Sequence, residues 1–412
     1  MQILFVSTMC SKETYKSIFE TRKIKLIDPS QKYFEQLIRG MTKNNNVKIQ
    51  ALSAIPVSYN TYSKQVIEPC EEVKDNINYH YIGFKNGRIS RFYSQYFAIY
   101  KYTRNWIKNE TRKGHRKSEI VIACDALSFH IAEPARRAAH REGIKTVAFL
   151  TDIPIYATNM KNKDNGYIRK LAISIYEKCA LDTCRSYDGY VYIVDGMQEK
   201  IGIKNKPFIT IEGSVDMDLQ KRKKYNSYNN TKTIIYAGGI YKIFGVDRLV
   251  KAFQLLNFED TELHLYGSGD YVQDLIQINQ IDNRIKYMGI SLNTEMLDIE
   301  KKATLLVNTR PTEDVFTKYS FPSKTLEYMS SGTPVLSTKL QGIPSDYWPY
   351  IYWISDDSIQ GIASALERVL EMDNTTLYAK GYSAQNYVYL HKNNEVQGKK
   401  IYEFFKKILI TD

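Results

Sequence analysis

The residues of this chain best suited to chemistry lie in the segment 306–338, LVNTRPTEDVFTKYSFPSKTLEYMSSGTPVLST. A predicted strand leads into a polar loop, a predicted helix follows over about residues 323–329, and Gly332 ends that helix. Lys324 is in the first helical turn, where a cation is unfavourable for the helix dipole unless an anion binds there. The pattern indicates a phosphate at this helix N-terminus, although a surface lysine would also tolerate the position.

Other polar side chains of the same segment could contact the same ligand. Glu327, in the middle of the helix, could accept hydrogen bonds from ribose hydroxyls, although it could also be a solvated helix carboxylate. Ser320 or Ser323 is placed to cap the helix. The preceding loop adds Arg310, Glu313 and Asp314.

Two glycine-rich turns precede this segment, and each follows a predicted strand. Residues 236–245 read YAGGIYKIFG, and residues 265–270 read LYGSGD. Glycines let backbone N–H groups approach a phosphate, although a Gly-Gly turn can also simply connect a strand to a helix. Open α/β sheets bind ligands at the carboxyl ends of their strands, so both turns are expected along that edge.

The elements that position these residues alternate between short apolar runs and longer helix-like segments, which is typical of βαβ units around parallel sheets. At 412 residues the chain is too long for one core, so each half is expected to form a doubly wound α/β domain. The predicted helices of the first half include 30–42 and 132–142. The predicted strands are 2–7, 47–51, 79–82, 120–123, 146–150 and 189–193, then 233–237, 262–266, 285–288, 303–307, 333–337 and 351–354.

A polar, asparagine-rich stretch separates the halves. Residues 220–232 read QKRKKYNSYNNTK, without an apolar period, and are the predicted linker. The predicted domains are 1–219 and 233–385, with residues 386–412 forming a C-terminal helix that crosses back to the N-terminal domain.

Positive charge is concentrated in the first half. Residues 1–215 hold 34 lysines and arginines against 21 acidic residues, whereas residues 216–412 hold 23 against 24. This asymmetry indicates a polyanion or an anionic membrane facing the first half. The segment 92–117 mixes aromatic residues with cations at helical spacing, as an interfacial helix does. The plainer alternative is an amphipathic helix packed on the first sheet, and no nucleic-acid-binding motif accompanies the charge.

Other features of the composition exclude several classes. No window approaches the roughly 18 apolar residues of a membrane span. The N-terminus has no basic segment and no cleavage site, so it predicts a core strand and an intracellular protein rather than a signal peptide. Five cysteines, without a CxxC pair, predict reduced thiols and neither a disulfide framework nor a zinc site.

In order, the motifs YAGG, LYGSGD, YMG at residues 287–289 and SFPSKxxEYMxxGxPV resemble the donor-binding domain of the family-4 glycosyltransferases, especially those of bacterial capsule and exopolysaccharide clusters. The resemblance is close over about residues 233–345 and weaker over the first half. It implies the GT-B fold, in which two Rossmann-like domains face each other across a cleft. The C-terminal domain would hold a nucleotide sugar and the N-terminal domain the acceptor, and the reaction would retain the anomeric configuration without a metal or another cofactor.

The resemblance also implies roles for single residues. Glu327 matches the second glutamate of the family's paired motif, which binds ribose. Residues 321–324 match the segment whose N–H groups hold the sugar and phosphates, Gly289 matches the turn over the nucleobase, and Gly239 matches the turn near the diphosphate. The expected donor-binding residues are Gly239, Lys242, Gly267, Tyr287, Gly289, Arg310, Glu313, Ser320, Phe321, Ser323, Lys324 and Glu327.

Two departures from the family pattern concern the sugar and the diphosphate. Tyr319 stands where the first glutamate is expected, so the contact to the sugar hydroxyls would pass to Glu313 or Asp314. The Arg and Lys pair that commonly neutralises the diphosphate is missing from YAGGIYKIFG. The expected substitutes are Lys242, Arg310 and Lys324.

In the first half, the same comparison brings out FLTDIPIY, residues 149–156. Asp152 is the candidate that orients or deprotonates the acceptor hydroxyl, and Asp125 is a second candidate by the same logic. A turn or capping aspartate is equally common after a strand. His130 and His140 are expected on helix surfaces rather than in catalysis.

The resemblance implies a hexosyltransferase that acts on a hydroxyl of a polyprenyl-diphosphate-linked oligosaccharide in capsule or exopolysaccharide synthesis. The protein would be cytoplasmic and peripheral on the inner face of the cell membrane, with a nucleotide sugar, a lipid-linked saccharide and anionic lipid as partners and no nucleic acid. Because of Tyr319, a catalytically silent nucleotide-sugar-binding protein is the alternative. An epimerase of the same architecture would carry a C-terminal His/Glu set that is not found.

Overall fold

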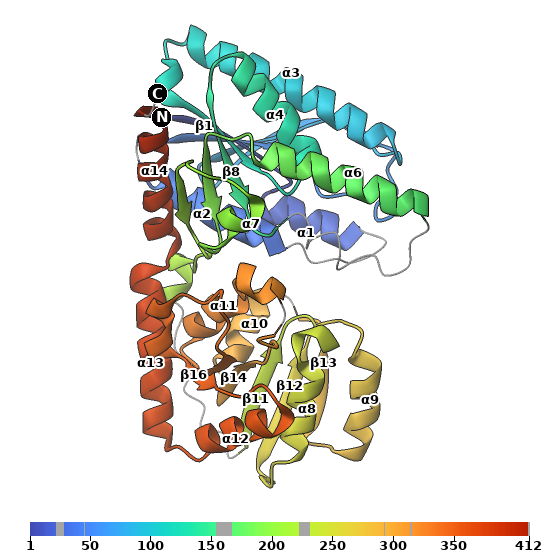
Figure 1. The fold of residues 1–412 in the computed structure, drawn as a ribbon, viewed down its shortest axis with the longest axis vertical. Coiled ribbons are helices and arrows are strands. Elements are labelled where there is room, and N and C mark those ends of the chain that lie inside the picture. Colours follow the sequence, from blue (N-terminus) through green and yellow to red (C-terminus); the bar gives the residue numbers. More distant parts are fainter. Residues whose placement is uncertain are drawn as a thin grey trace. The chain divides into compact units, whose positions relative to one another are not determined.

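The computed structural model describes residues 1–21, 29–44, 46–153, 167–221, 231–291, 293–313 and 315–410. It divides into two compact units, unit 1 with Met1–Ser214 and Asn394–Asp412, and unit 2 with Val215–Asn393. Each unit has its own largely parallel sheet covered by helices (Figure 1). The expected α/β fold is therefore confirmed. Residues 222–230 of the predicted linker lie outside the described residues.

The sheet of unit 1 has eight strands in the order β10-β9-β8-β7-β1-β2-β5-β4. All neighbours are parallel except β4 and β5. The order reverses between β1 and β7, so the loops after these two strands lie at the topological switch point. The strands are β1 Gln2–Ser7, β2 Lys48–Ser53, β4 Cys70–Lys74, β5 Ile77–Tyr81, β7 Ile120–Asp125, β8 Lys145–Leu150, β9 Gly189–Tyr192 and β10 Phe208–Thr210, with β3 Val66–Ile67 and β6 Phe84–Lys85 forming a separate pair.

Seven α-helices accompany this sheet in the described part of unit 1, among them the C-terminal helix α14 Asn394–Ile410, which packs on α2 Pro29–Thr42. A Cβ atom on Gly40 would lie 1.8 Å from the carbonyl oxygen of Asn394, and one on Gly398 would lie 2.4 Å from the carbonyl carbon of Gly40. Glycine at both positions lets the two helices touch through their backbones. The other helices are α1 Lys12–Thr21, α3 Ser90–Arg112, α4 Phe129–Arg141, α6 Tyr167–Cys184 and α7 Met197–Ile201.

The sheet of unit 2 has six parallel strands in the order β13-β12-β11-β14-β15-β16. Its switch point lies between β11 and β14, where the chain turns from one side of the sheet to the other. The strands are β11 Lys232–Ala237, β12 Thr261–Tyr266, β13 Ile285–Gly289, β14 Leu305–Asn308, β15 Val335–Thr338 and β16 Tyr352–Ile354.

Six α-helices pack around this second sheet in the described residues, and α8 pairs with α12 while α11 pairs with α13. The core between the sheet and α8 is apolar, with Ile234, Leu249, Phe253 and Val307 fully buried. The helices are α8 Val246–Gln254, α9 Val272–Ile281, α10 Asn293–Glu300, α11 Lys324–Ser331, α12 Ile359–Leu370 and α13 Asn374–His391, with short 3-10 helices η3 Lys242–Phe244, η4 Val315–Tyr319 and η5 Ser345–Tyr350.

Three general features complete the fold. The five cysteines are free, and Cys10, Cys124 and Cys184 are buried. No helix in the part of the chain that the structure describes has both the length and the apolar character needed to cross a bilayer. Among the same residues, no group of three or more His, Cys, Asp or Glu side chains could hold a metal ion.

Candidate functional site

Three loops at the carboxyl edge of the unit 2 sheet are bonded to one another through their backbones. The N–H of Gly238 donates to the carbonyl of Tyr266 at 2.9 Å, and the N–H of Ile240 donates to that of Ser268 at 2.9 Å. The N–H of Gly267 donates to the carbonyl of Gly289 at 2.8 Å. The loops after β11, β12 and β13 therefore form one continuous layer, which we call the loop layer.

Gly267 has a packing role in this layer. Its φ is +139°, and a Cβ atom there would lie 1.8 Å from the carbonyl oxygen of Gly238. Only glycine fits, because one turn rests directly on the backbone of the other. The Tyr287 hydroxyl donates to the Gly267 carbonyl at 3.0 Å and fixes the layer further. The structure thus gives Gly267 and Tyr287 a structural function beside the donor contacts expected from the sequence.

The turn after β13 is open. A Cβ atom on Gly289 would meet no atom within 4 Å, and Met288 and Ile290 beside it are exposed. Open backbone flanked by exposed apolar side chains can be covered by a flat ring. The geometry at Gly289 therefore suits the nucleobase position that the resemblance implies.

Arg310 brings a positive charge to the loop layer from the other side of the switch point. Its guanidinium carbon lies 4.7 Å from the centre of the Phe244 ring, in the loop after β11. The hydroxyl of Tyr236 donates to the carbonyl of Gly239 at 2.9 Å. Burial raises the pKa of Tyr236 to about 12, and the nearby charge of Arg310 opposes that rise. Arg310 therefore places a cation near a glycine turn whose own sequence lacks the expected arginine.

Lys242 is directed elsewhere. Its ammonium nitrogen lies 3.0 Å from the Asp274 carboxylate on α9 and 5.3 Å from the centre of the Tyr271 ring. The hydrogen bond that Lys242 donates to the Asp274 carboxylate raises the pKa of Lys242. Lys242 is therefore held toward α9, whereas the Arg310 guanidinium lies over Phe244 in the loop after β11.

The N-terminus of α11 lacks the expected side-chain cap. Ser323 has helical backbone angles, and its side chain makes no capping hydrogen bond. The Ser320 hydroxyl is buried and has no hydrogen-bond partner among the described residues. Phe321 is buried, with its ring centre 5.4 Å from that of Tyr347. The prediction that Ser323 caps the helix is wrong, because the chain enters α11 already in a helical conformation.

The amide of Asn308 was not recognised as a candidate from the sequence. Asn308 ends β14 at the switch point and is 6% exposed. Its Nδ2 is buried without a hydrogen-bond partner in the described part of the chain. An unsatisfied buried donor costs about 1–3 kcal/mol, so this amide has bonding capacity that a ligand could use. An asparagine at the end of an apolar strand is the signal that could have revealed it.

Lys324 lies between two carboxylates. Its ammonium donates to Glu327 Oε1 at 2.8 Å and lies 3.9 Å from Glu300 Oε1. Burial acts to lower the pKa of Lys324, but the two carboxylates outweigh it and the pKa is raised. The structure brings Lys324 and Glu327 together, as the sequence did not predict, and adds Glu300 from α10.

The remaining loop candidates are less defined. Glu313 is exposed, and Asp314 lies outside the described residues. Tyr319, at the position of the missing glutamate, is half-buried, with the Lys318 ammonium 5.6 Å from its ring centre.

In unit 1, Asp125 stands at the switch point at the end of β7 but is engaged by its own turn. It is buried and accepts hydrogen bonds from the Leu127 N–H at 3.2 Å and the Ser128 hydroxyl at 2.8 Å. Burial raises the pKa of Asp125 to about 6, against the lowering effect of these bonds. This geometry is that of a turn aspartate.

Asp152 follows the neighbouring strand β8, at the same edge of the unit 1 sheet. It is half-buried and accepts a hydrogen bond from the N–H of Ile153 at 2.7 Å. Residues 154–156, which complete the expected FLTDIPIY turn, lie outside the described residues. Asp152 is less buried than Asp125 and is the more accessible carboxylate.

The two histidines differ. His140 is exposed and has Nε2 at 3.0 Å from the Thr146 hydroxyl, in agreement with a helix-surface position. His130 packs against Phe92, with ring centres 5.3 Å apart, and burial lowers its pKa to about 4. A surface position for His130 is therefore wrong, because α3 covers this side of α4.

Comparisons with known proteins agree with this architecture. Residues 231–372 match the model of the family Glycosyl transferases group 1. No protein of curated function matches the sequence closely enough to count as a relative.

Solved structures of similar architecture span the whole chain. Sucrose-phosphate synthase from Thermosynechococcus elongatus has 12% identity and a TM-score of 0.68, with 99% of each chain covered. A glycosyltransferase from Rickettsia africae has 12% identity and a TM-score of 0.65, covering 100% of this chain and 99% of its own. The Anabaena protein HepE, in complex with UDP, has 13% identity and a TM-score of 0.63, covering 99% and 100%.

At such identities the likeness shows the fold, which is GT-B, as expected from the motifs. The chain is a glycosyltransferase of GT-B fold, and residues 231–372, within unit 2, match the model of the group 1 family.

Proposed function

We propose that this enzyme transfers a hexose from a nucleoside diphosphate sugar, with retention at the anomeric carbon and without a metal. The observation that carries the donor part is the cation of Arg310 beside the loop layer, at the switch point of the group 1 domain. The HepE structure contains UDP, which makes UDP the first nucleotide to test.

The donor roles follow the geometry of unit 2. Arg310, the Gly239 turn and the N-terminus of α11 meet the diphosphate, because the turn and helix offer N–H groups and Arg310 offers charge. Glu327 meets the ribose, and the turn at Gly289 lies under the base. Buried Phe321 fixes the position of the chain where it enters α11. Ser320 and Ser323, on either side of it, lie nearest the sugar.

The acceptor is proposed to be a hydroxyl of a polyprenyl-diphosphate-linked oligosaccharide in capsule or exopolysaccharide synthesis. The bond from the anomeric carbon to the β-phosphate oxygen breaks, and the acceptor oxygen bonds to the same face of that carbon. The acceptor proton passes to the departing phosphate, so no protein nucleophile is required. Asp152 orients the acceptor hydroxyl, while Asp125 has less support because its turn engages both of its oxygens.

A thermal-shift comparison of UDP-, GDP- and dTDP-sugars tests the donor part. A ligand at 100 times its dissociation constant adds about 2.7 kcal/mol to the free energy of unfolding. We expect one nucleotide to raise the melting temperature and its sugar to be hydrolysed slowly without acceptor. Stabilisation without any hydrolysis or transfer would favour the silent binding protein, and no stabilisation by any nucleotide sugar would contradict the proposal.

Asp152→Asn is expected to lower the rate of transfer to acceptor while leaving donor affinity unchanged, because its carboxylate would contact only the acceptor hydroxyl. The measurement is kcat with a saturating lipid-linked acceptor, beside calorimetry with UDP. Asp125→Asn is the control, expected to lower the melting temperature because it weakens a buried turn. Full transfer by Asp152→Asn would leave Asp152 as a turn residue.

The membrane part of the proposal rests on the outward face of α3. Tyr93, Phe97, Lys101, Lys108 and Arg112 are exposed, and their spacing puts them within about 100° of the helix circumference. The only acidic residue of this helix, Glu110, is buried. An exposed face with aromatic rings and cations but no carboxylate fits an anionic lipid surface.

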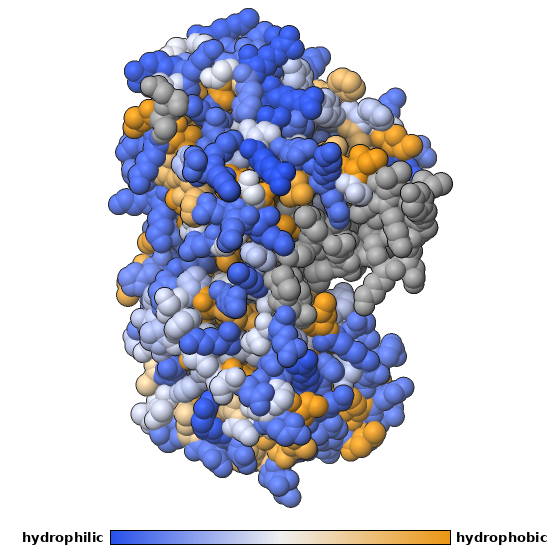
Figure 2. Space-filling model, viewed as in Figure 1, coloured by the Kyte–Doolittle hydropathy of each residue, from blue (hydrophilic) through white to orange (hydrophobic). Residues whose placement is uncertain are grey.

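The aromatic part of this face is broader than α3 alone. Ring contacts connect Phe92 to His130 at 5.3 Å, and Phe129 to Tyr176 of α6 at 4.5 Å. Hydrophobic side chains gather beside the first turns of α3 in Figure 2. On α6, Ile175 and Tyr176 are exposed. α3 leads into β7, which is parallel to its neighbours β1 and β8. The last turns of α3 therefore lie toward the amino edge of the sheet, and its first turns lie toward the carboxyl edge, where Asp152 stands.

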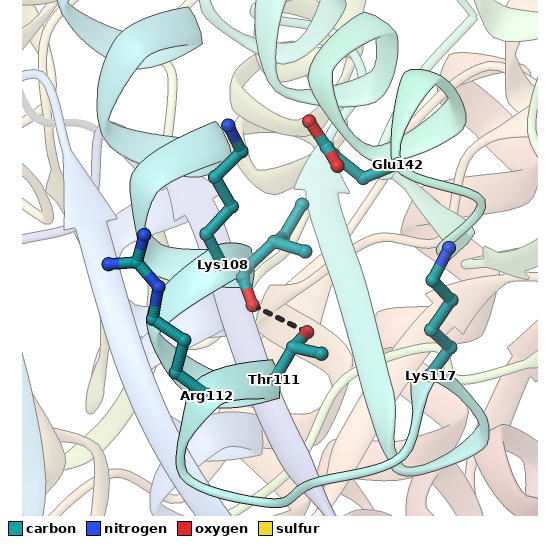
Figure 3. Close-up of a pocket in the computed structure, with 6 residues that line it drawn as sticks. Lys108, Thr111, Arg112, Lys117 and Glu142 are labelled. Atoms are coloured by element: carbon teal, nitrogen blue, oxygen red, sulfur yellow. Dashed lines mark hydrogen bonds between the residues drawn. The ribbon is translucent and has the colours of Figure 1, made fainter.

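The last turns of α3 form the basic part. A pocket of about 270 Å³ is lined by Lys108, Arg112 and Lys117 together with Ile107, Thr111 and Glu142 (Figure 3). These three cations form no ion pair with any residue that the structure describes. Lys113 and Arg116 differ, because they bind Glu110 at 2.7 Å and Glu119 at 2.9 Å.

Replacing Lys108, Arg112 and Lys117 together by glutamine is expected to weaken binding to anionic vesicles about 100-fold at low salt, since each cation near such a surface contributes about 1 kcal/mol. Co-sedimentation measures the effect. The control replaces the exposed lysines Lys204, Lys251 and Lys399, which changes the net charge equally. Equal binding by the two variants would mean that these three cations are not the membrane-binding surface.

A further inference from the structure

The Lys324 ammonium connects two helices of unit 2. It hydrogen-bonds Glu327, one turn further along α11, and faces Glu300, the last residue of α10. The exposed fractions of the side chains are 28% for Lys324, 13% for Glu327 and 0% for Glu300. The Thr333 hydroxyl, just beyond α11, donates to the Glu300 backbone carbonyl at 2.7 Å. Glu300, at the end of α10, is therefore in contact with residues at both ends of α11.

This arrangement is poorly explained as a device for stability. Removing charged groups from water costs several kcal/mol per ion, and a buried ion pair is often replaced by apolar residues without loss. The Lys324 ammonium also lies in the first turn of α11, where the helix dipole disfavours a cation. The side chain of Glu300 is 0% exposed, and its negative charge makes the largely buried Lys324 ammonium tolerable at this position.

The same contacts argue against Lys324 as a phosphate ligand. To reach a diphosphate, its ammonium would have to leave the 2.8 Å bond to Glu327 and move away from Glu300. Arg310 already provides a cation at the glycine turn, with its guanidinium carbon 4.7 Å from the centre of the Phe244 ring. A carboxylate has about four acceptor sites, so the bond from Lys324 fixes the orientation of Glu327 without saturating it.

We propose that Lys324, anchored by Glu300, is a positioning residue that holds the Glu327 carboxylate in the orientation that binds the ribose hydroxyls of the donor. This inference rests on the proposed function, in which Glu327 meets the ribose. It assigns Glu300, a residue of another helix, to the donor site although it makes no contact with the nucleotide.

Calorimetry with UDP, 2′-deoxy-UDP and uridine tests the inference, using full-length wild type, Glu327→Ala, Lys324→Met and Glu300→Gln. Wild type is expected to prefer UDP to 2′-deoxy-UDP by roughly tenfold or more, as one charge-assisted hydrogen bond allows. Lys324→Met should lose this preference as far as Glu327→Ala does, and should weaken UDP and uridine by the same factor. Lys242→Met is the matched control, since its ammonium is bound to Asp274, and should keep the preference.

Three results would overturn the inference or its basis. If Lys324→Met keeps the ribose preference and weakens UDP more than uridine, Lys324 is a phosphate ligand. If wild type binds UDP without preferring it to the deoxy form, Glu327 does not meet the 2′-hydroxyl and there is nothing to position. If wild type binds no nucleotide, the proposed function itself fails. Should Lys324→Met not fold, Glu300→Gln decides: a reduced preference supports the inference, and an unchanged one overturns it.

Discussion

Glu327→Ala is expected to weaken UDP binding by about 3 kcal/mol or more, roughly 150-fold, without unfolding the protein. Two charge-assisted hydrogen bonds to the ribose, each of about 1.5–3 kcal/mol, would be lost. The bond from Lys324 at 2.8 Å would be lost as well, but Glu300 remains beside the ammonium to compensate its charge. Calorimetry gives the affinity, and the melting temperature reports on the fold.

Glu367→Ala is the control for this substitution, because Glu367 is an exposed glutamate on α12 of the same unit. It should leave both the affinity and the melting temperature close to those of wild type. Unchanged UDP affinity in Glu327→Ala would reject the ribose role, whatever the behaviour of the control.

Arg310→Ala is expected to weaken UDP by about 1.5–3 kcal/mol, roughly 10-fold to 150-fold, while the affinity for uridine stays the same. Only the diphosphate carries the charge that the guanidinium would meet. Arg310→Lys should recover part of the loss, because a lysine keeps the charge but not the forked guanidinium that can bind a phosphate through two N–H groups. Parallel titrations with UDP, UMP and uridine measure the difference.

Lys242→Ala is the control for Arg310→Ala. It removes a cation from the loop after β11, over which Arg310 lies, and the Lys242 ammonium is bound to Asp274. It should change UDP affinity little. If Arg310→Ala weakens uridine as much as UDP, the guanidinium supports the loop layer and the phosphates bind elsewhere.

Most of the sheet architecture could be predicted from the sequence because buried parallel strands consist of continuous apolar residues. β1 and β7 are buried at every position, and both were expected within two residues of their bounds. β4, Cys70–Lys74, was missed because it is a largely exposed antiparallel edge strand with the polar sequence CEEVK. β10 was missed because it has only three residues.

The donor candidates were harder to predict, since their roles depend on partners distant in the sequence. A first-turn lysine suggests a phosphate when only its own helix is considered, whereas Glu300 lies 24 residues earlier on another helix. Gly267 resembled a phosphate-binding glycine, but its close approach to Gly238 is visible only in three dimensions. Arg310 was expected as a substitute cation, and the geometry that favours it over Lys242 comes from the folded loops.

Helix α14 follows unit 2 in the sequence but packs on α2 of unit 1. Both ends of the chain belong to unit 1, so unit 2 is topologically an insertion between Ser214 and Asn394. The chain enters and leaves unit 2 through neighbouring residues, because Val215 forms a parallel bridge with Asn393. Unit 2 is therefore one contiguous segment of the sequence, whereas a fragment ending before α14 would expose the backbone of α2 at Gly40.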